Sequence, residues 1–170
     1  MDEPAAWLNQ AVADRLAAEH FVADGEATGR CHAIAKWQQT VEKAVKAIVS
    51  SLHDAGVLGA GIRAKHDVER YVRTLIGLPR AAGNRTIQRH LHRLLDQATR
   101  AGIKALDGLA PQFPARRNTE YPFQVAPGQW TYPAAKDVFS SDEAKQFRAL
   151  AHRILDGAGR IVSAVRRRSR

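Results

Sequence analysis

Between Gly29 and Ala55 an apolar side chain recurs every three or four residues without interruption. The side chains that carry this period are Ile34, Trp37, Val41, Val45, Ile48 and Leu52. Because an α-helix turns once in about 3.6 residues, this spacing puts them all on one face of a long helix. Gly56 is placed to act as its C-cap. A helix with so long an apolar stripe buries it against other helices, so we expect a helical bundle with Trp37, Val41, Val45 and Ile48 in its core.

Four further segments carry the same period, and none shows a convincing strand alternation. They are expected at about 4–22, at 65–78, at 85–106 after an N-cap at Asn84, and from residue 140 to about 165. Ser140-Ser141-Asp142-Glu143 is typical of a capping box. The apolar face of the first helix is predicted to be Leu8, Val12, Leu16 and Phe21. These elements favour an all-α fold, an up-and-down antiparallel bundle of four or five helices.

Residues 1–165 are expected to form a single domain, because 170 residues fit one domain better than two. Within it, residues 108–139 stand apart as a long irregular loop that holds five of the seven prolines together with Tyr121, Trp130 and Tyr132. A loop of this length in a compact domain is functional or partly disordered, and we expect it to wrap around the outside of the bundle. Residues 166–170 are predicted to be an exposed basic tail.

Several classes of protein are disfavoured by what the sequence lacks. The single cysteine, Cys31, rules out a disulfide framework within the chain and is expected to be a small buried apolar residue. No apolar run approaches the roughly 20 residues of a membrane span, so we expect no membrane association and a cytoplasmic location. The seven histidines lack the HxxxH spacing of a helical metal site, and no phosphate-binding glycine motif is present. We therefore expect neither a metal nor a cofactor.

Positive charge is concentrated in the second part of the chain. The net charge is +9; residues 1–69 carry 7 basic and 10 acidic side chains, whereas residues 70–170 carry 19 basic and 7 acidic. Nineteen of the 26 cations are arginines, whose planar guanidinium suits phosphate recognition. This asymmetry favours a polyanionic partner such as a nucleic acid or a nucleotide. A biased genome composition is the alternative source of so many arginines.

Four segments of the chain share features with one known family of helical domains. Residues 31–47, which contain Gln38-Gln39, Glu42-Lys43 and Lys46-Ala47, are similar to the long helix of that family. Residues 65–75, with His66-Asp67 near their start, are similar to its next element, and Tyr121-Pro122 before the last helix is similar to a feature of one subgroup. The last helix, from Ser140 to Leu155, is similar to the family's final helix. With these segments the chain resembles the HEPN family over about residues 5–165, in the family's order.

The resemblance implies an up-and-down helical bundle that forms a homodimer. Many HEPN domains are metal-independent ribonucleases with an Arg-x4-6-His motif near the start of the last bundle helix; others bind nucleotides or act as partner proteins. Prokaryotic members often belong to toxin–antitoxin or phage-defence modules beside a nucleotidyltransferase-like partner. Here Arg116-Arg117-Asn118 provides the opening of the motif, but no histidine follows at the required spacing. Tyr121, with a reference pKa of about 10, would be a poor general base in its place.

The candidate site for phosphate or substrate is therefore Arg116, Arg117, Asn118 and Tyr121. The favoured function is the binding of RNA or a nucleotide without catalysis. One alternative is a metal-independent ribonuclease that uses Arg117 and Tyr121, and another is a structural bundle with no nucleic-acid role. The pair His66-Asp67 is expected to stabilise the start of its helix. The side chains of Gln38, Gln39, Glu42, Lys43 and Lys46 are expected to form the polar face of their helix, with i,i+4 pairs such as Glu42–Lys46 or contacts between subunits.

Overall fold

The computed structural model describes residues 1–23, 27–59, 68–78, 85–110 and 116–168, and this part of the chain is predominantly helical. In chain order its elements are α1 (Glu3–Ala23), α2 (Ala27–Asp54), α3 (Val68–Ile76), α4 (Arg85–Leu94), α5 (Gln97–Asp107), β1 (Phe123–Ala126), β2 (Gln129–Thr131) and α6 (Ser141–Arg168). The predicted all-α class is confirmed by this predominance of helices. The His66-Asp67 pair and the proposed Asn84 cap lie outside the described residues.

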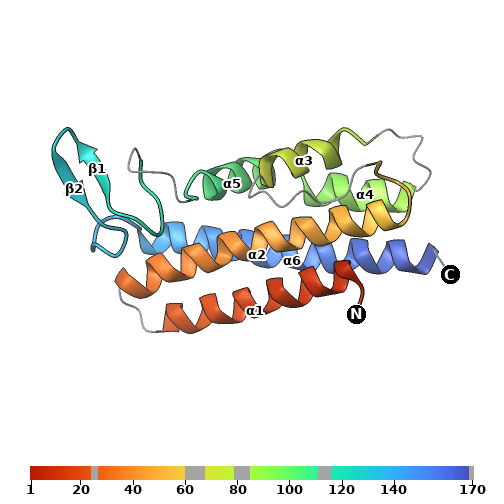
Figure 1. Cartoon of the computed structure of the whole chain (residues 1–170), viewed down its shortest axis with the longest axis horizontal. Helices are drawn as coiled ribbons and strands as arrows, with labels where there is room; N and C mark the ends of the chain where they lie inside the picture. The colour runs from red at the N-terminus through yellow and green to blue at the C-terminus, as the bar shows by residue number, and fades with distance from the viewer. Residues whose placement is uncertain (24–26, 60–67, 79–84, 111–115, 169–170) are drawn as a thin grey trace.

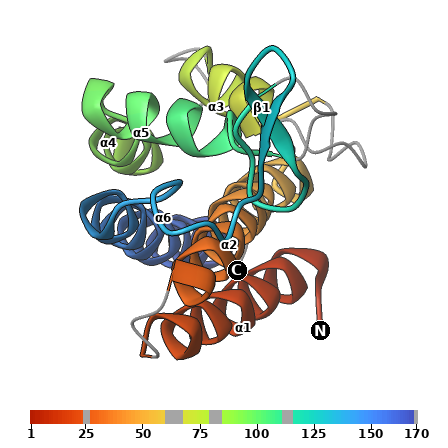
Figure 2. The ribbon, with the colours of Figure 1, turned by 90° about the vertical axis from the view of Figure 1, so that its left-hand side faces the viewer.

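The two longest helices, α2 and α6, lie side by side in the middle of the molecule (Figures 1 and 2). They run in the same direction, and α1 runs against them on one side, while α3, α4 and α5 cover the other side (Figure 1). Both termini therefore meet at one end of the bundle, where the Arg166 guanidinium donates to the Asp2 carboxylate. Arg166 and Arg167 belong to α6, so the residues predicted to begin an exposed tail instead extend the last helix.

The predicted core of α2 is confirmed. Trp37, Val45 and Ile48 are fully buried, and Val41 is 2% exposed. The capping box of α6 is also formed, because the Glu143 amide donates to Ser140 Oγ at 3.1 Å and the Ser140 amide donates to Glu143 Oε2 at 3.3 Å. These two helices bring their apolar stripes together and set the frame on which the other elements pack.

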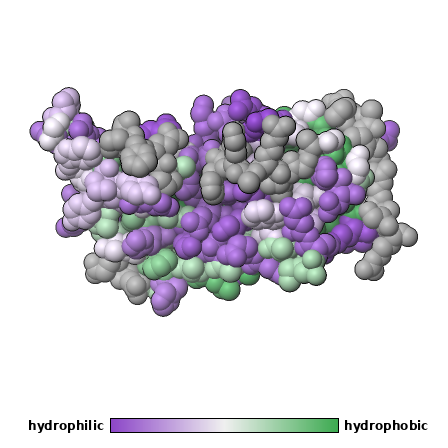
Figure 3. Space-filling model, in the orientation of Figure 1, coloured by the Kyte–Doolittle hydropathy of each residue, from purple (hydrophilic) through white to green (hydrophobic). Residues whose placement is uncertain are grey.

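The predicted apolar face of α1 is confirmed for Leu8 and Phe21, which pack against the core, and is wrong for Val12 and Leu16. Ala11 and Ala18 are fully buried, whereas Val12 is 38% exposed and Leu16 is 55% exposed. Small side chains on the inner face let α1 pack close to α2, and the larger side chains are left on the outside. Apolar residues accordingly gather along the lower edge of the molecule in Figure 3, over α1.

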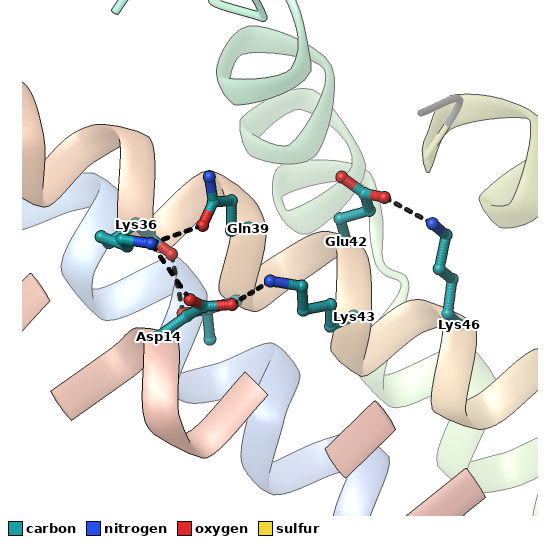
Figure 4. A network of polar contacts seen from close by, with 7 residues as sticks. Asp14, Lys36, Gln39, Glu42, Lys43 and Lys46 are labelled. Carbon is teal, nitrogen blue, oxygen red and sulfur yellow. Dashed lines mark hydrogen bonds and ion pairs between the residues drawn. The ribbon is translucent and has the colours of Figure 1, made fainter. Parts of the chain in front are cut away.

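Part of the predicted polar face of α2 packs against α1. Asp14 of α1 is 4% exposed and accepts from Lys43 and, at 3.4 Å, from Lys36 of α2 (Figure 4). The predicted Glu42–Lys46 pair is confirmed, with Nζ 2.6 Å from Oε1, but both residues are buried. The Lys46 ammonium lies over the ring of Trp7 of α1, 4.8 Å from its centroid. This face of α2 therefore forms the polar part of the α1–α2 interface.

The predicted fourth helix is divided into α4 and α5. Asp96 has φ −63° and ψ 172°, which is extended backbone, and its carboxylate accepts from the Thr99 amide at 2.8 Å. Asp96 thus acts as the N-cap of a new helix. Because the helical phase restarts there, Ala98 is exposed and not part of the apolar face.

The described part of the 108–139 segment contains an antiparallel hairpin that the sequence interpretation missed. β1 pairs with β2 in the register Phe123↔Thr131 and Gln124↔Trp130, with an irregularity before Ala126. Gly128 has φ 76°, a conformation that favours glycine in a tight turn. The hairpin projects at the end of the bundle where α2 and α6 begin (Figure 1), so the segment stands beyond the helices and does not simply wrap around them.

Candidate functional site

Asn118, one of the four residues predicted to form the site, organises a turn through its own side chain. It is fully buried, and its carboxamide oxygen accepts from the amides of Glu120 at 2.9 Å and Tyr121 at 2.6 Å. Its Nδ2 donates to the Arg116 carbonyl at 3.2 Å. Asparagine side chains commonly replace a backbone partner in this way. The Asn118 side chain therefore holds residues 116–121 in a defined shape and is not available to a ligand.

Arg117 joins this turn to the beginning of α6. Its NH2 nitrogen donates to Glu143 Oε1 at 2.6 Å, and its NH1 nitrogen donates to Glu143 Oε2 at 3.3 Å and to the Val138 carbonyl at 2.9 Å. The guanidinium also lies over the Phe139 ring, 4.9 Å from its centroid. Burial raises the pKa of Glu143, but the hydrogen bonds from Arg117 and the Ser140 amide, together with the Arg117 charge, lower it overall. Glu143 therefore stays ionised as the partner of Arg117.

The turn is also attached to α2. The Cys31 thiol donates to the Thr119 carbonyl at 3.3 Å, and Arg30 Nε donates to the Phe139 carbonyl at 3.2 Å. Burial, with a smaller contribution from the Glu120 charge, raises the pKa of the Cys31 thiol. A buried thiol in this state is a poor nucleophile, which agrees with the expected packing role of Cys31.

The four predicted site residues thus lie close together in the chain but have different roles. Arg117 and Asn118 spend their hydrogen bonds on the fold, whereas Arg116 and Tyr121 are exposed. These residues fix the start of the hairpin that follows and, as the structure describes them, do not form a phosphate-binding pocket.

A groove lies along one side of α6. The helix α6 itself is placed between α1 and α4 (Figure 2). The volume of the groove is about 940 Å³. Arg15 of α1, His90 of α4, and His152, Arg160 and Arg167 of α6 supply its basic lining, with Leu8, Val12 and Leu155 as its apolar lining. A second hollow of about 300 Å³ shares His90 and Arg160 with it and adds Arg93 and Arg153. We call the two together the α6 groove.

Four arginines of the α6 groove, Arg15, Arg93, Arg160 and Arg167, make no ion pair with any residue that the structure describes. Arg153 and His152 are paired: Arg153 NH2 lies 2.6 Å from Asp96 Oδ2, and His152 Nε2 lies 2.7 Å from Glu19 Oε1. Asp156 is the acidic residue of the lining. The α6 groove therefore carries an excess of positive charge that a polyanion could neutralise.

Sequence interpretation missed the α6 groove because three helices contribute to it. One signal was present in the printed sequence: Arg153, Arg160 and Arg167 are spaced seven residues apart, which places them on one face of a helix. What covers or flanks that face could only come from the packing of α1 and α4.

Among the described residues, no group of histidine, cysteine and carboxylate side chains is arranged to hold a metal ion. The helices of this part of the chain also include none with the length and apolar character to cross a membrane. Comparisons with family models, curated proteins and solved structures find no match to this chain.

Proposed function

We propose that this chain is a HEPN-like helical bundle that binds RNA or a nucleotide through the α6 groove without cleaving it. The observation that carries the proposal is the convergence of Arg15, Arg93, Arg160 and Arg167, each without a carboxylate partner in the described chain, on one concave surface. The resemblance of residues 31–47 and 140–155 to HEPN helices supports the same class of ligand.

Arginine and phosphate make strong, charge-assisted and often bidentate contacts. Binding to a nucleic acid also releases condensed counterions, so that each phosphate contact contributes to the salt dependence of the affinity. Four arginines on one surface, none of them ion-paired with a described residue, are therefore expected to give tight binding at low salt that weakens steeply as salt is added.

The absence of a histidine after Arg116-Arg117-Asn118 favours binding over cleavage. The Arg117 guanidinium already donates to Glu143 and to the Val138 carbonyl. These contacts disfavour the catalytic pair of Arg117 with Tyr121 that the sequence had left open.

One observation favours a ribonuclease as the second candidate function. His90 and His152 both line the α6 groove beside Arg160. In such a reaction one imidazole accepts the proton of a ribose 2′-OH as this oxygen attacks phosphorus. The other donates a proton to the 5′-oxygen as its bond to phosphorus breaks, and a 2′,3′-cyclic phosphate is left. Incubation of the protein with RNA in EDTA tests this function, and loss of any cleavage in His90→Ala and His152→Ala variants would support it.

Binding is tested by removing charge from the α6 groove. The Arg160→Gln/Arg167→Gln variant is compared with Arg73→Gln/Arg100→Gln, which removes two exposed arginines from α3 and α5. Affinity for a fluorescent 12-nucleotide RNA is measured at 50 and 200 mM salt. The groove variant should bind at least tenfold more weakly at 50 mM salt and show a shallower salt dependence, while the control should lose less than threefold. Equal losses in both variants would mean a non-specific basic surface and would contradict the proposal.

The HEPN resemblance also supports a homodimer and a nucleotidyltransferase-like partner in a toxin–antitoxin or defence module. The exposed apolar side chain of Leu16 on α1, which lies outside the lining of the α6 groove, offers a surface for a protein contact. Light scattering at tens of micromolar tests the homodimer, and a monomeric mass at that concentration would contradict it.

A further inference from the structure

The hairpin β1–β2 presents two large aromatic rings to solvent. Trp130 is 55% exposed and Tyr132 is 59% exposed. Trp130 belongs to β2 and lies on the face opposite Thr131, because successive residues of a strand point to opposite faces. Tyr132 directly follows the last residue of β2, two positions after Trp130. The register places Gln124 directly across from Trp130 and Phe123 across from Thr131. Phe123 is buried, so one face of the hairpin packs on the protein and the other displays the Trp130 ring.

The hairpin is firmly attached at its base. Phe123 is 3% exposed, and Phe139, which follows the hairpin, is 2% exposed. The Asn118 turn precedes β1, and the Arg117 guanidinium ties that turn to Val138 and Glu143. Rings on a fixed support lose little conformational freedom when they bind a flat ligand, which favours affinity.

The hairpin itself carries no charged side chain. No Asp, Glu, Lys or Arg occurs from Tyr121 to Ala135, and the hairpin appears in pale shades in Figure 3 beside the purple of the bundle. Exposed charges of both signs flank this stretch, Arg116 and Glu120 before it and Lys136 and Asp137 after it. A nucleotide can therefore place its base on the rings without repulsion between its phosphate and a carboxylate of this stretch.

We infer that Trp130 and Tyr132 form a stacking platform for unpaired bases, so that the RNA bound by this protein is single-stranded at the hairpin. The inference rests on the proposed function and names its substrate class. Aromatic rings stack on any base, and alanine substitution of such rings costs single-strand affinity. Gln124 adds an amide that can donate to or accept from a base edge.

Charge decides between the two partners that such rings could serve. Tryptophan and tyrosine are also common in protein interfaces, but the hairpin belongs to residues 70–170, which carry 19 basic and 7 acidic side chains. A polyanion with flat, unpaired bases complements both the charge and the rings. The hairpin precedes the first turn of α6, and His152 of the α6 groove lies about three helical turns further along the same helix.

The test compares Trp130→Ala and Tyr132→Ala with Val125→Ala, which truncates an exposed aliphatic side chain of the same hairpin (63% exposed). Each protein is titrated against a labelled 12-nucleotide oligouridylate and against a 12-base-pair RNA duplex. Each ring substitution should weaken single-strand binding about tenfold and change duplex binding less than twofold. The Val125→Ala variant should match the wild type with both RNAs. Trp130→Phe and Tyr132→Phe, which keep a ring, should recover most of the affinity.

Two further measurements separate this inference from the proposed function. Of the three tryptophans, Trp37 is buried and Trp7 is half-buried beneath Lys46, whereas Trp130 is exposed. Oligouridylate should therefore quench tryptophan emission in the wild type and much less in Trp130→Phe. Unchanged single-strand affinity in the alanine variants, or an equal loss with the duplex, would overturn the stacking platform, and unchanged affinity for both RNAs is the result expected of a protein-contact surface. The Arg160→Gln/Arg167→Gln variant should bind both RNAs more weakly. If its affinity for both were unchanged, binding through the α6 groove would be contradicted, while the stacking platform would still be tested by the Trp130 and Tyr132 variants.

Discussion

Arg117 and Glu143 are joined by two hydrogen bonds, NH2 to Oε1 at 2.6 Å and NH1 to Oε2 at 3.3 Å. The same glutamate closes the capping box of α6 by accepting from the Ser140 amide. One carboxylate therefore both begins the last helix and holds the turn from which the hairpin rises. This double use explains why an arginine expected to meet a ligand is instead occupied by the fold.

Replacing Arg117 should reduce stability. Arg117→Ala removes the hydrogen bond to the Val138 carbonyl and the pair with Glu143, and we expect a loss of about 1–2 kcal/mol, because the arginine side chain is 40% exposed and the pair is partly screened. Urea unfolding measures the loss. A double-mutant cycle with Glu143→Gln should give a coupling energy well above zero. Additive losses of stability would contradict the pairing of Arg117 with Glu143.

Two glycines of α6 should respond in opposite ways to alanine. A Cβ on Gly157 would lie 2.7 Å from Leu94 Cδ2 and 3.0 Å from its Cγ, whereas a Cβ on Gly159 would meet nothing within 4 Å. Leu94 is buried, so Gly157→Ala should destabilise the α4–α6 contact by about 1–3 kcal/mol. Gly159→Ala should stabilise the protein by about 0.5–1 kcal/mol through helix propensity. Thermal unfolding of both variants checks the pair, and a gain in stability for Gly157→Ala would show that α4 yields without cost.

The cap of α5 should make stability fall in acid. The hydrogen bond from the Thr99 amide, aided by the hydrogen bond and charge of Arg153, lowers the pKa of Asp96 from 3.8 to about 2. A carboxyl group whose pKa is lowered by folding stabilises the folded state above its unfolded pKa and loses that effect as the pH falls through its folded pKa. The contribution should therefore be complete above about pH 4 and disappear towards about pH 2.

The matched variant for this pH effect is Asp96→Asn, which keeps a good N-cap residue but does not titrate at this position. Urea unfolding of both proteins between pH 5 and pH 2 should show a difference in stability that shrinks as the pH falls. A difference that stays constant over this range would argue against a lowered pKa for Asp96.

Asp14 should be the most sensitive carboxylate of the α1–α2 interface. Its side chain is 5% exposed and faces both Lys36 and Lys43, so Asp14→Asn leaves two ammonium groups without their negative partner. We expect a loss of about 2–3 kcal/mol, somewhat less than for a fully buried pair because both lysines reach solvent. Asp142→Asn, which breaks a pair with an 83% exposed carboxylate, should cost less than about 0.5 kcal/mol. Equal effects in urea unfolding would contradict this assignment.

The sequence predicted the central helices because their signals are local and strong. The apolar stripe of α2 and the Ser140–Glu143 box of α6 each depend on residues within one or a few turns. The inner face of α1 could not be read in the same way, because Ala11 and Ala18 were chosen by close packing on α2 and not by their apolar area. The break at Asp96 was hidden by apolar residues that continue on both sides of it, and the hairpin by strands of four and three residues.

The candidate site was harder to predict than the fold. Arg117 and Asn118 look like ligand-binding residues in the sequence, and only the positions of Glu143, Val138 and the turn amides show how they are used. Arg15, Arg93 and Arg160 come together from three helices, so no linear motif could contain them. Trp130 and Tyr132, by contrast, are two positions apart in the sequence. Their pairing can be recognised only after the structure shows a strand at this place.

The hydrogen bond from Cys31 to the Thr119 carbonyl gives this protein a built-in kinetic reporter. The thiol is buried, its pKa is raised, and it is the sole cysteine of the chain. An alkylating reagent can reach it only when the turn lifts away from α2, so the rate of labelling in native buffer counts those openings. The same measurement with RNA present would show whether a strand bound on the hairpin slows the opening of the turn, with no substitution in the protein.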